Sequence, residues 1–163
     1  MAGGVATSQF RFEKRRTEAL VRLSNGAIAQ GCFFTGGGSA RHDGPERVWD
    51  LLNEETGFFP FEVHGTLGTR TVLYNRAHVV TVALSEEEAS REPGYAVATR
   101  RDVSMLLSTG ERISGSVRVY RPEGRDRLSD WSRQSDTFRY VETENVTLIV
   151  NAAHIVEISE VSR

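Results

Sequence analysis

The chain has 163 residues, of which 39% are hydrophobic and 26% are charged, and its formal net charge is −2. This balance is typical of a folded soluble protein. The slightly negative charge supplies no global positive field for nucleic acid or anionic lipid, and no run approaches the roughly 20 apolar residues of a membrane helix. We therefore expect a cytoplasmic protein without a membrane partner, and nucleic-acid binding is disfavoured.

Residues 1–19 are predicted to form an N-terminal tail, because they are small and polar, then charged, and lack the apolar stretch of a secretory signal. The first structured unit is predicted at residues 20–84. It opens with an alternating strand that ends at Asn25-Gly26, a strong hairpin signal since both residues accept positive φ. The next strand contains the single cysteine, Cys32, which excludes an intrachain disulfide. Its apolar neighbours predict a buried, inert thiol without a basic partner.

A glycine-rich loop follows at residues 35–40. It lacks the Gly-Lys-Ser/Thr signature of a phosphate loop, so we predict a flexible connection. Residues 47–53 are predicted to form one helical turn, too short to be stable alone. Three further strands are predicted: 58–63, 71–73 and 79–84.

A charged linker, residues 85–102, holds three consecutive glutamates that we expect to be solvated and a helical turn before Pro93. The second unit, residues 103–163, is then a diverged copy of the first. The run from Val21 to Gly26 matches the run from Met105 to Gly110. Further matches follow in the same order: Gly31 with Gly115, Arg47 with Arg127, Asp50 with Asp130, Phe58 with Phe138, Asn75 with Asn151 and His78 with His154.

This organisation predicts an all-β protein with minor helix. About five short strands in each copy, with turns at regular spacing, favour a small barrel over a sandwich. A unit of this size is marginal alone, so two tandem SH3-like or Sm-like barrels are expected to pack on each other.

Each half resembles the Sm-like and SH3-like small barrels. The resemblance rests on the strand before Asn25-Gly26, on Gly31, and on Asp50-x-x-Asn53. In Sm-like proteins the matching Asp and Asn lie in an RNA-contacting loop, a later Arg-Gly pair completes the pocket, and the barrels assemble into rings. The second copy has Arg133 in place of the Asn, and neither copy has Arg-Gly before its last strand. The resemblance also extends to a family of uncharacterised bacterial proteins built from such units.

Candidate binding residues come from the polar and aromatic positions of the two copies. The shared Asn-x-x-His pattern indicates a pair lining a site or, preferably, an Asn that caps a strand corner and a His that packs on the next strand. In each copy an Arg and an Asp lie three residues apart, Arg47 with Asp50 and Arg127 with Asp130. Each pair indicates a cap and ion pair or, alternatively, an arginine that is available to an acidic partner. Phe59 and Phe61 indicate a strand at an interface. The full set is Arg47, Asp50, Asn53, Phe59, Phe61, Asn75, His78, Arg127, Asp130, Asn151 and His154.

No nucleophile elbow, His-Glu-x-x-His motif or clustered metal ligands stand out, so we predict no enzyme activity, no cofactor and no metal. The predicted function is a non-enzymatic protein-binding or scaffolding module, with a protein partner or self-association. The alternatives are an Sm-like RNA-binding protein and a small-ligand sensor.

Overall fold

The computed structural model describes residues 14–37, 44–120, 124 and 126–162. Most of the predicted tail and residues 38–40 of the predicted flexible loop lie outside this range.

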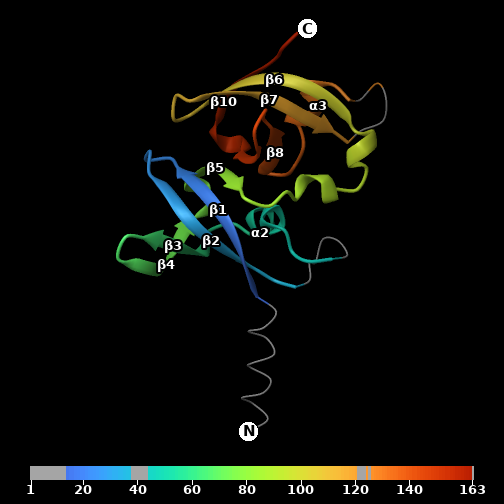
Figure 1. Cartoon of the computed structure of the whole chain (residues 1–163). Helices are drawn as coiled ribbons and strands as arrows, with labels where there is room; N and C mark the ends of the chain where they lie inside the picture. The colour runs from blue at the N-terminus through green and yellow to red at the C-terminus, as the bar shows by residue number, and fades with distance from the viewer. Residues whose placement is uncertain (1–13, 38–43, 121–123, 125, 163) are drawn as a thin grey trace.

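The described chain contains two halves with the same order of elements (Figure 1). The first half comprises β1 (Arg15–Leu23), β2 (Ile28–Thr35), α2 (Val48–Glu54), β3 (Phe58–Gly65), β4 (Gly68–Asn75), the 3-10 turn η1 (Arg76–His78) and β5 (Val79–Leu84). The second half comprises β6 (Thr99–Leu107), β7 (Arg112–Val119), α3 (Leu128–Ser132), β8 (Phe138–Glu142), β9 (Thr147–Asn151), η4 (Ala152–His154) and β10 (Ile155–Glu160). The linker forms η2 (Ala89–Arg91) and η3 (Tyr95–Val97), which confirms the helical turn before Pro93.

The ten strands of the described part of the chain belong to one antiparallel sheet, in the order β10-β6-β7-β8-β9-β5-β1-β2-β3-β4. The prediction of an all-β protein with minor helix is confirmed. In each half the last strand lies beside the first, and the two halves are joined by the pairing of β5 with β9. Within the described residues the sheet does not close on itself, because β4 and β10 remain as its two edges.

The strand registers of the two halves correspond at the residues that the sequence matched. Phe58 lies opposite Asn75 in the first half, as Phe138 lies opposite Asn151 in the second. Other equivalent pairs are Val21 with Val82 and Met105 with Ile158, and Cys32 with Glu62 and Ser116 with Glu142. The two halves therefore share a strand register as well as an order of elements.

Both structured units start earlier than residues 20 and 103. β1 begins at Arg15 and β6 at Thr99, where the sequence analysis places the tail and the linker. The polar run at the start of β1 pairs with β2 from Arg15 onward, and Thr17 within it is buried. The sequence did not indicate a strand at residues 15–18 because they are hydrophilic, yet their backbone hydrogen bonds extend the strand beyond the apolar residues.

A glycine lets the second and third strands of each half approach closely. A Cβ on Gly31 would lie 1.8 Å from the carbonyl oxygen of Glu62, and one on Gly115 would lie 2.6 Å from that of Glu142. No side chain fits at such distances, so the backbone contact requires glycine at both matched positions.

The described residues form two hydrophobic core clusters, and each draws residues from both halves. The first consists mainly of first-half residues and includes Phe138 and Ile149 from the second. The other consists mainly of second-half residues and includes Val80 from the first. Each half therefore completes the core of the other. Within the described residues no helix is long and apolar enough to cross a membrane.

Candidate functional site: the seam between the halves

We use the term seam for the contacts that join the two halves, centred on the pairing of β5 with β9. Three residue pairs form this ladder: Thr81 with Val150, Val82 with Ile149 and Ala83 with Leu148. These central pairs lie between β1 and β8, so the seam is continuous with the sheet on both sides.

Asn151 and His154 of the Asn-x-x-His pattern lie at the end of this ladder. The Asn151 side-chain oxygen accepts a hydrogen bond from the Ala153 amide at 2.9 Å, which confirms the predicted corner cap. Its Nδ2 donates across the seam to the Val79 carbonyl at 2.9 Å. His154 Nε2 contacts the Ala77 carbonyl at 2.7 Å, and because a carbonyl only accepts, Nε2 carries the proton. The second copy of the pattern is thus both a cap and a bond between the halves.

Asn75 and His78 repeat the local part of this arrangement. The Asn75 side chain caps Ala77 at 3.0 Å, and His78 Nδ1 lies 2.8 Å from the Ser24 hydroxyl, as His154 Nδ1 lies 2.6 Å from Ser108. Among the described residues, Asn75 Nδ2 and His78 Nε2 make no bond equivalent to those across the seam. These two nitrogen atoms lie at the η1 corner, beside the edge strand β4 of the described sheet.

Asn53 forms a second connection across the seam. Its Nδ2 donates to the Phe138 carbonyl at 3.0 Å, and its Oδ1 accepts from the Phe138 amide at 2.8 Å. The side-chain amide therefore extends the backbone bonding of β8 toward α2. The Sm-like resemblance implies that Asp50 and Asn53 contact RNA. In the structure Asp50 is buried, and Asn53 is bonded to the Phe138 backbone.

At three matched positions, the apolar side chain is buried in the half where the seam covers it and exposed in the other half. Phe138, Ile149 and Val80 lie in the seam and are at most 2% exposed. Their matched residues in the other half are Phe58 at 61%, Leu73 at 66% and Val156 at 66%. Phe58 and Leu73 lie on β3 and β4, and Val156 lies on β10. The sheet edges thus expose apolar residues whose counterparts the seam buries.

Phe59 and Phe61, proposed from the sequence as binding residues, are only 1% and 0% exposed. They pack against Phe33, with ring centroids 5.3 and 5.0 Å away. The strict alternation of β3 turns them into the core and leaves Phe58 outside. The correct surface candidate in this run is therefore Phe58.

Arg47 and Asp50 lie buried at the start of α2. They pair at 3.3 Å, and the Asp50 carboxylate also accepts from the Arg47 amide at 2.7 Å, so the predicted cap and ion pair are confirmed. Burial acts to lower the pKa of Arg47, but hydrogen bonds with Asp50 and with Glu92 of the linker outweigh it and raise the pKa. In the second half, the Asp130 carboxylate accepts from the exposed Arg127 amide at 3.0 Å, so this pair is also a cap.

Glu88 of the linker is buried, in contrast to the solvated run that the sequence analysis expects. Its carboxylate accepts bonds from the amides of Val48 and Trp49 at the start of α2, and from the Tyr140 hydroxyl on β8 at 3.0 Å. Burial raises the pKa of Glu88 despite these donors. Burial also raises the pKa of Tyr140, with the neighbouring Glu88 charge adding to the effect. One linker carboxylate thus fastens both halves.

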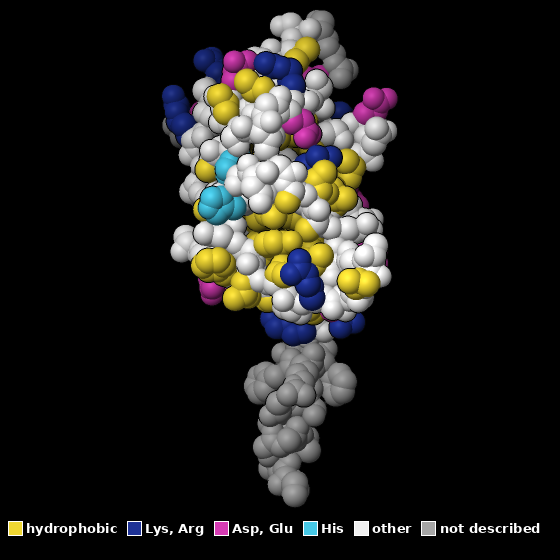
Figure 2. Space-filling view, turned by 90° about the vertical axis from the view of Figure 1, so that its left-hand side faces the viewer, with side chains coloured by type: hydrophobic (Ala, Val, Ile, Leu, Met, Phe, Trp, Pro, Cys, Tyr) yellow, Lys and Arg dark blue, Asp and Glu magenta, His cyan; other side chains and the backbone are white. Residues whose placement is uncertain are grey.

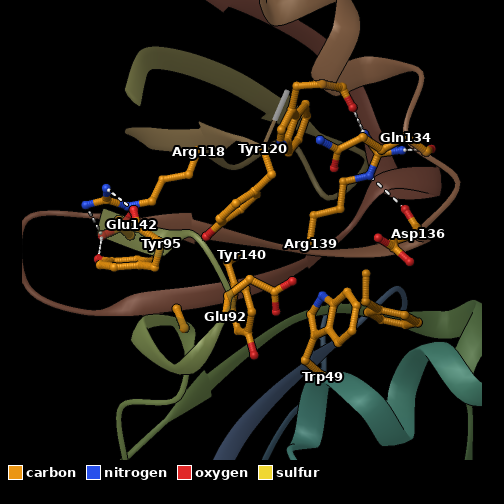
Figure 3. Close-up of a pocket in the computed structure, with 13 residues that line it drawn as sticks. Trp49, Glu92, Tyr95, Arg118, Tyr120, Gln134, Asp136, Arg139, Tyr140 and Glu142 are labelled. Atoms are coloured by element: carbon orange, nitrogen blue, oxygen red, sulfur yellow. Dashed lines mark hydrogen bonds and ion pairs between the residues drawn. The ribbon is translucent and has the colours of Figure 1, made fainter. Parts of the chain in front are cut away.

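An aromatic cavity of about 60 Å³ lies where the linker crosses the seam (Figure 3). Trp49 of α2 stacks with Tyr140 of β8, and Arg118 lies over the Tyr95 ring with its centre 3.8 Å from the centroid. Glu142 accepts from Arg118 at 2.6 Å and from Tyr95. Arg118 at this cavity pairs with Glu142, Glu92 pairs with Arg47 at the start of α2, and Arg139 donates to backbone carbonyls, so we assign the cavity to the attachment of the linker.

A wider groove of about 330 Å³ follows the seam past α2 and both 3-10 corners. Its lining includes Asn53, Arg76, Phe138 and Asn151. Figure 2 shows apolar side chains gathered near mid-height of the molecule, with a basic side chain in front of them. The buried Arg76 donates to the carbonyls of Leu51 and Phe58, and therefore ties the end of α2 to β3.

Several important residues carried no signal in the sequence. Arg76 and Arg139 donate to backbone carbonyls at the ends of α2 and α3, yet they occupy unmatched positions in the two copies. Nothing in the acidic run separates Glu88 from its exposed neighbours. Cys32 is buried as predicted, but His64 Nε2 lies 3.6 Å from its sulfur, so the expectation of no basic partner was wrong.

Comparison of the chain with protein-family models, with curated proteins and with solved structures found no match.

Proposed function

We propose that this protein is a non-enzymatic scaffold that assembles head to tail, with the β4 edge of one chain pairing with the β10 edge of the next. The observation that carries the proposal is the exposure of Phe58, Leu73 and Val156, whose counterparts Phe138, Ile149 and Val80 are buried in the seam. An apolar residue at an open sheet edge favours addition of a strand.

The seam supplies the register of the proposed contact. Val82 with Ile149 corresponds to Ile158 of one chain with Leu73 of the next, and Ala83 with Leu148 corresponds to Ser159 with Val72. Phe58 and Leu73 would then enter the second-half core of the neighbouring chain, as Phe138 and Ile149 enter the first-half core within one chain. Val156 would take the place of Val80.

Polar groups at the edges match the same arrangement. In the proposed contact, Asn75 Nδ2 takes the part that Asn151 Nδ2 has in the seam. It would donate to the Ile155 carbonyl of the next chain, which matches the Val79 carbonyl. His78 Nε2 would likewise donate to the Ala153 carbonyl of the next chain, which matches the Ala77 carbonyl that His154 contacts in the seam. Each chain therefore carries the donors on one edge and the acceptors on the other.

Two features make the proposed contact weaker than the seam. Arg133 stands where the seam has Asn53, and a guanidinium donates to a carbonyl but cannot accept from an amide. The seam is also fastened by a linker through Glu88 and Glu92, whereas separate chains have no such connection. We therefore expect association that depends on protein concentration.

We also propose that each half is curled into a small barrel, as the sequence resemblance implies. The separate hydrophobic cluster of each half and the position of each last strand beside the first support two curled units. Because the two edges of one chain differ, the contact is heterologous and generates a ring or an open filament according to the rotation between subunits.

Sedimentation velocity from micromolar to millimolar concentration tests this assembly. Leu73→Arg blocks the β4 edge and Val156→Arg blocks the β10 edge, so each variant alone should stay monomeric. A mixture of the two retains one intact edge of each kind and should form a one-to-one dimer. Val97→Arg, at an exposed linker position, is the matched control and should assemble like the wild type. Wild-type protein that stays monomeric throughout would contradict the proposal.

A further inference from the structure

A cluster of metal-ligating side chains lies on the face of β2 and β3 that is turned away from the core. Cys32 and Glu62 are directly opposite each other in the ladder, and His64 follows Glu62 by two residues on the same face. The Cys32 sulfur, a Glu62 carboxylate oxygen and a His64 ring nitrogen all lie within 4.8 Å of one another. Three different strong ligand types therefore converge from two adjacent strands.

The two separations measured from the His64 nitrogen match those of a tetrahedral site. Cys32 Sγ lies 3.6 Å from His64 Nε2, which lies 3.3 Å from Glu62 Oε1. A tetrahedral zinc ion has Zn–S distances of about 2.3 Å and Zn–N and Zn–O distances of about 2.0–2.1 Å. These lengths hold sulfur and nitrogen about 3.6 Å apart, and nitrogen and oxygen about 3.3–3.4 Å apart. The sheet therefore holds the His64 nitrogen near the distances from the thiol sulfur and the carboxylate oxygen that an ion requires, with the third separation within 4.8 Å.

The cluster is fixed on one side and open on the other. Cys32 is 4% exposed, and the side chains of Glu62 and His64 are 14% and 37% exposed. Glu18 of β1 lies opposite Cys32 on the other side of β2 and adds a carboxylate near the thiol. A groove of about 230 Å³, lined by Glu18 and His64, opens beside the cluster. Water or Glu18 is therefore available as a fourth ligand.

The second half does not repeat this ligand set. Ser116 and Glu142 form the ladder pair that matches Cys32 and Glu62. The Ser116 hydroxyl donates to Asp102, and Glu142 is bound to Arg118 and Tyr95. In the first half Glu62 pairs with Arg16 at 3.3 Å, but the Arg16 side chain is 66% exposed. Such a surface ion pair is weak and yields readily to a cation.

We propose that Cys32, Glu62 and His64 form a binding site for a divalent transition metal ion of the zinc class. The combination of thiolate, imidazole and carboxylate selects zinc over magnesium or calcium, which prefer all-oxygen sites. Three protein ligands leave one position for water or for a donor from Glu18. The site is separate from the seam and from both proposed assembly edges.

Metal titration of the full-length chain tests the site. Protein treated with EDTA and dialysed should bind about one equivalent of Zn²⁺ in competition with a chromogenic chelator. With Co²⁺ it should show a thiolate-to-metal charge-transfer band that Cys32→Ser abolishes. Cys32→Ser and His64→Ala should each weaken zinc binding at least about tenfold, because even changes to residues that only support the ligands weaken metal affinity by about tenfold or more. Glu144→Gln, an exposed acidic position in the second half, should leave the affinity unchanged.

Circular dichroism of each metal-free variant checks whether it folds, and the cobalt band reports on the site independently of stability. Absence of zinc binding by the wild type, or binding that survives both Cys32→Ser and His64→Ala unchanged, would overturn the proposal.

Discussion

Asn151 Nδ2 donates a 2.9 Å hydrogen bond to the carbonyl oxygen of Val79, joining the second half of the chain to the first. Its counterpart Asn75 caps its own corner in the same way but lies at an open edge. Two side chains with the same local role therefore differ in what they contribute to the fold and in what they offer to a neighbouring chain.

Alanine substitution should separate these roles. Asn151→Ala removes a cap and leaves the Val79 carbonyl without its donor, so we expect a loss of about 1–3 kcal/mol in the free energy of unfolding. Asn75→Ala removes the cap alone and should cost about 1 kcal/mol. Urea denaturation of dilute protein measures both, and sedimentation velocity should show weaker association for Asn75→Ala. Equal stability losses together with unchanged association would refute the assignment.

A matched aromatic pair tests the exposure argument. Phe138 is 2% exposed and contributes to the first-half core, so Phe138→Ala should destabilise the chain by about 3–5 kcal/mol. Phe58 is 61% exposed, so Phe58→Ala should change the stability of the monomer by about 0.5 kcal/mol or less, while it weakens association. A large stability loss from Phe58→Ala at low concentration would show that Phe58 is already covered within one chain.

The buried carboxyl of Glu88 predicts a pH dependence. Its pKa in the folded chain lies above the ordinary 4.5, so the unfolded chain releases this proton at lower pH than the folded one. The stability that Glu88 contributes is then fully present below pH 4.5 and falls as pH rises through the higher, folded-state pKa. Glu88→Gln does not titrate. Its stability relative to the wild type should therefore increase as pH rises above 4.5, as measured by urea denaturation at a series of pH values. A difference that is flat or decreases with pH would contradict this account.

The close approach of β2 and β3 predicts a specific cost for a single methyl group. A Cβ at Gly31 would lie 1.8 Å from the Glu62 carbonyl oxygen, whereas one at Gly65 would meet its nearest atom at 3.4 Å. We expect Gly31→Ala to destabilise the chain by about 1–3 kcal/mol, as overpacking does, and Gly65→Ala to be nearly neutral. Thermal unfolding gives the melting temperatures of the two variants for comparison. Similar melting temperatures would mean that the strands separate at little cost.

The sequence predicted the strands, the corner caps and the matched residues because each depends on local chemistry. Asn-Gly turns, alternation and an Asn side chain bonded two residues ahead all act over a few positions. It could not place Glu88, because burial of that carboxylate depends on α2 and β8, which arrive from distant parts of the chain. It also missed the approach of His64 to Cys32, since that contact follows from the register of β2 against β3. The exposed edges are likewise a property of the sheet order, which no single segment encodes.

The most direct test of head-to-tail assembly is disulfide trapping between Val72→Cys and Ser159→Cys chains. These positions correspond to Leu148 and Ala83, which lie opposite each other in the seam. Opposite residues in an antiparallel pair have Cα atoms about 4.5–5.5 Å apart, within the range of a disulfide. The wild type, with buried Cys32, is the control. Under mild oxidation the mixture of the two variants should give a cross-linked dimer, and neither variant alone should do so. Cross-linking of one variant to itself, or none in the mixture, would contradict the account.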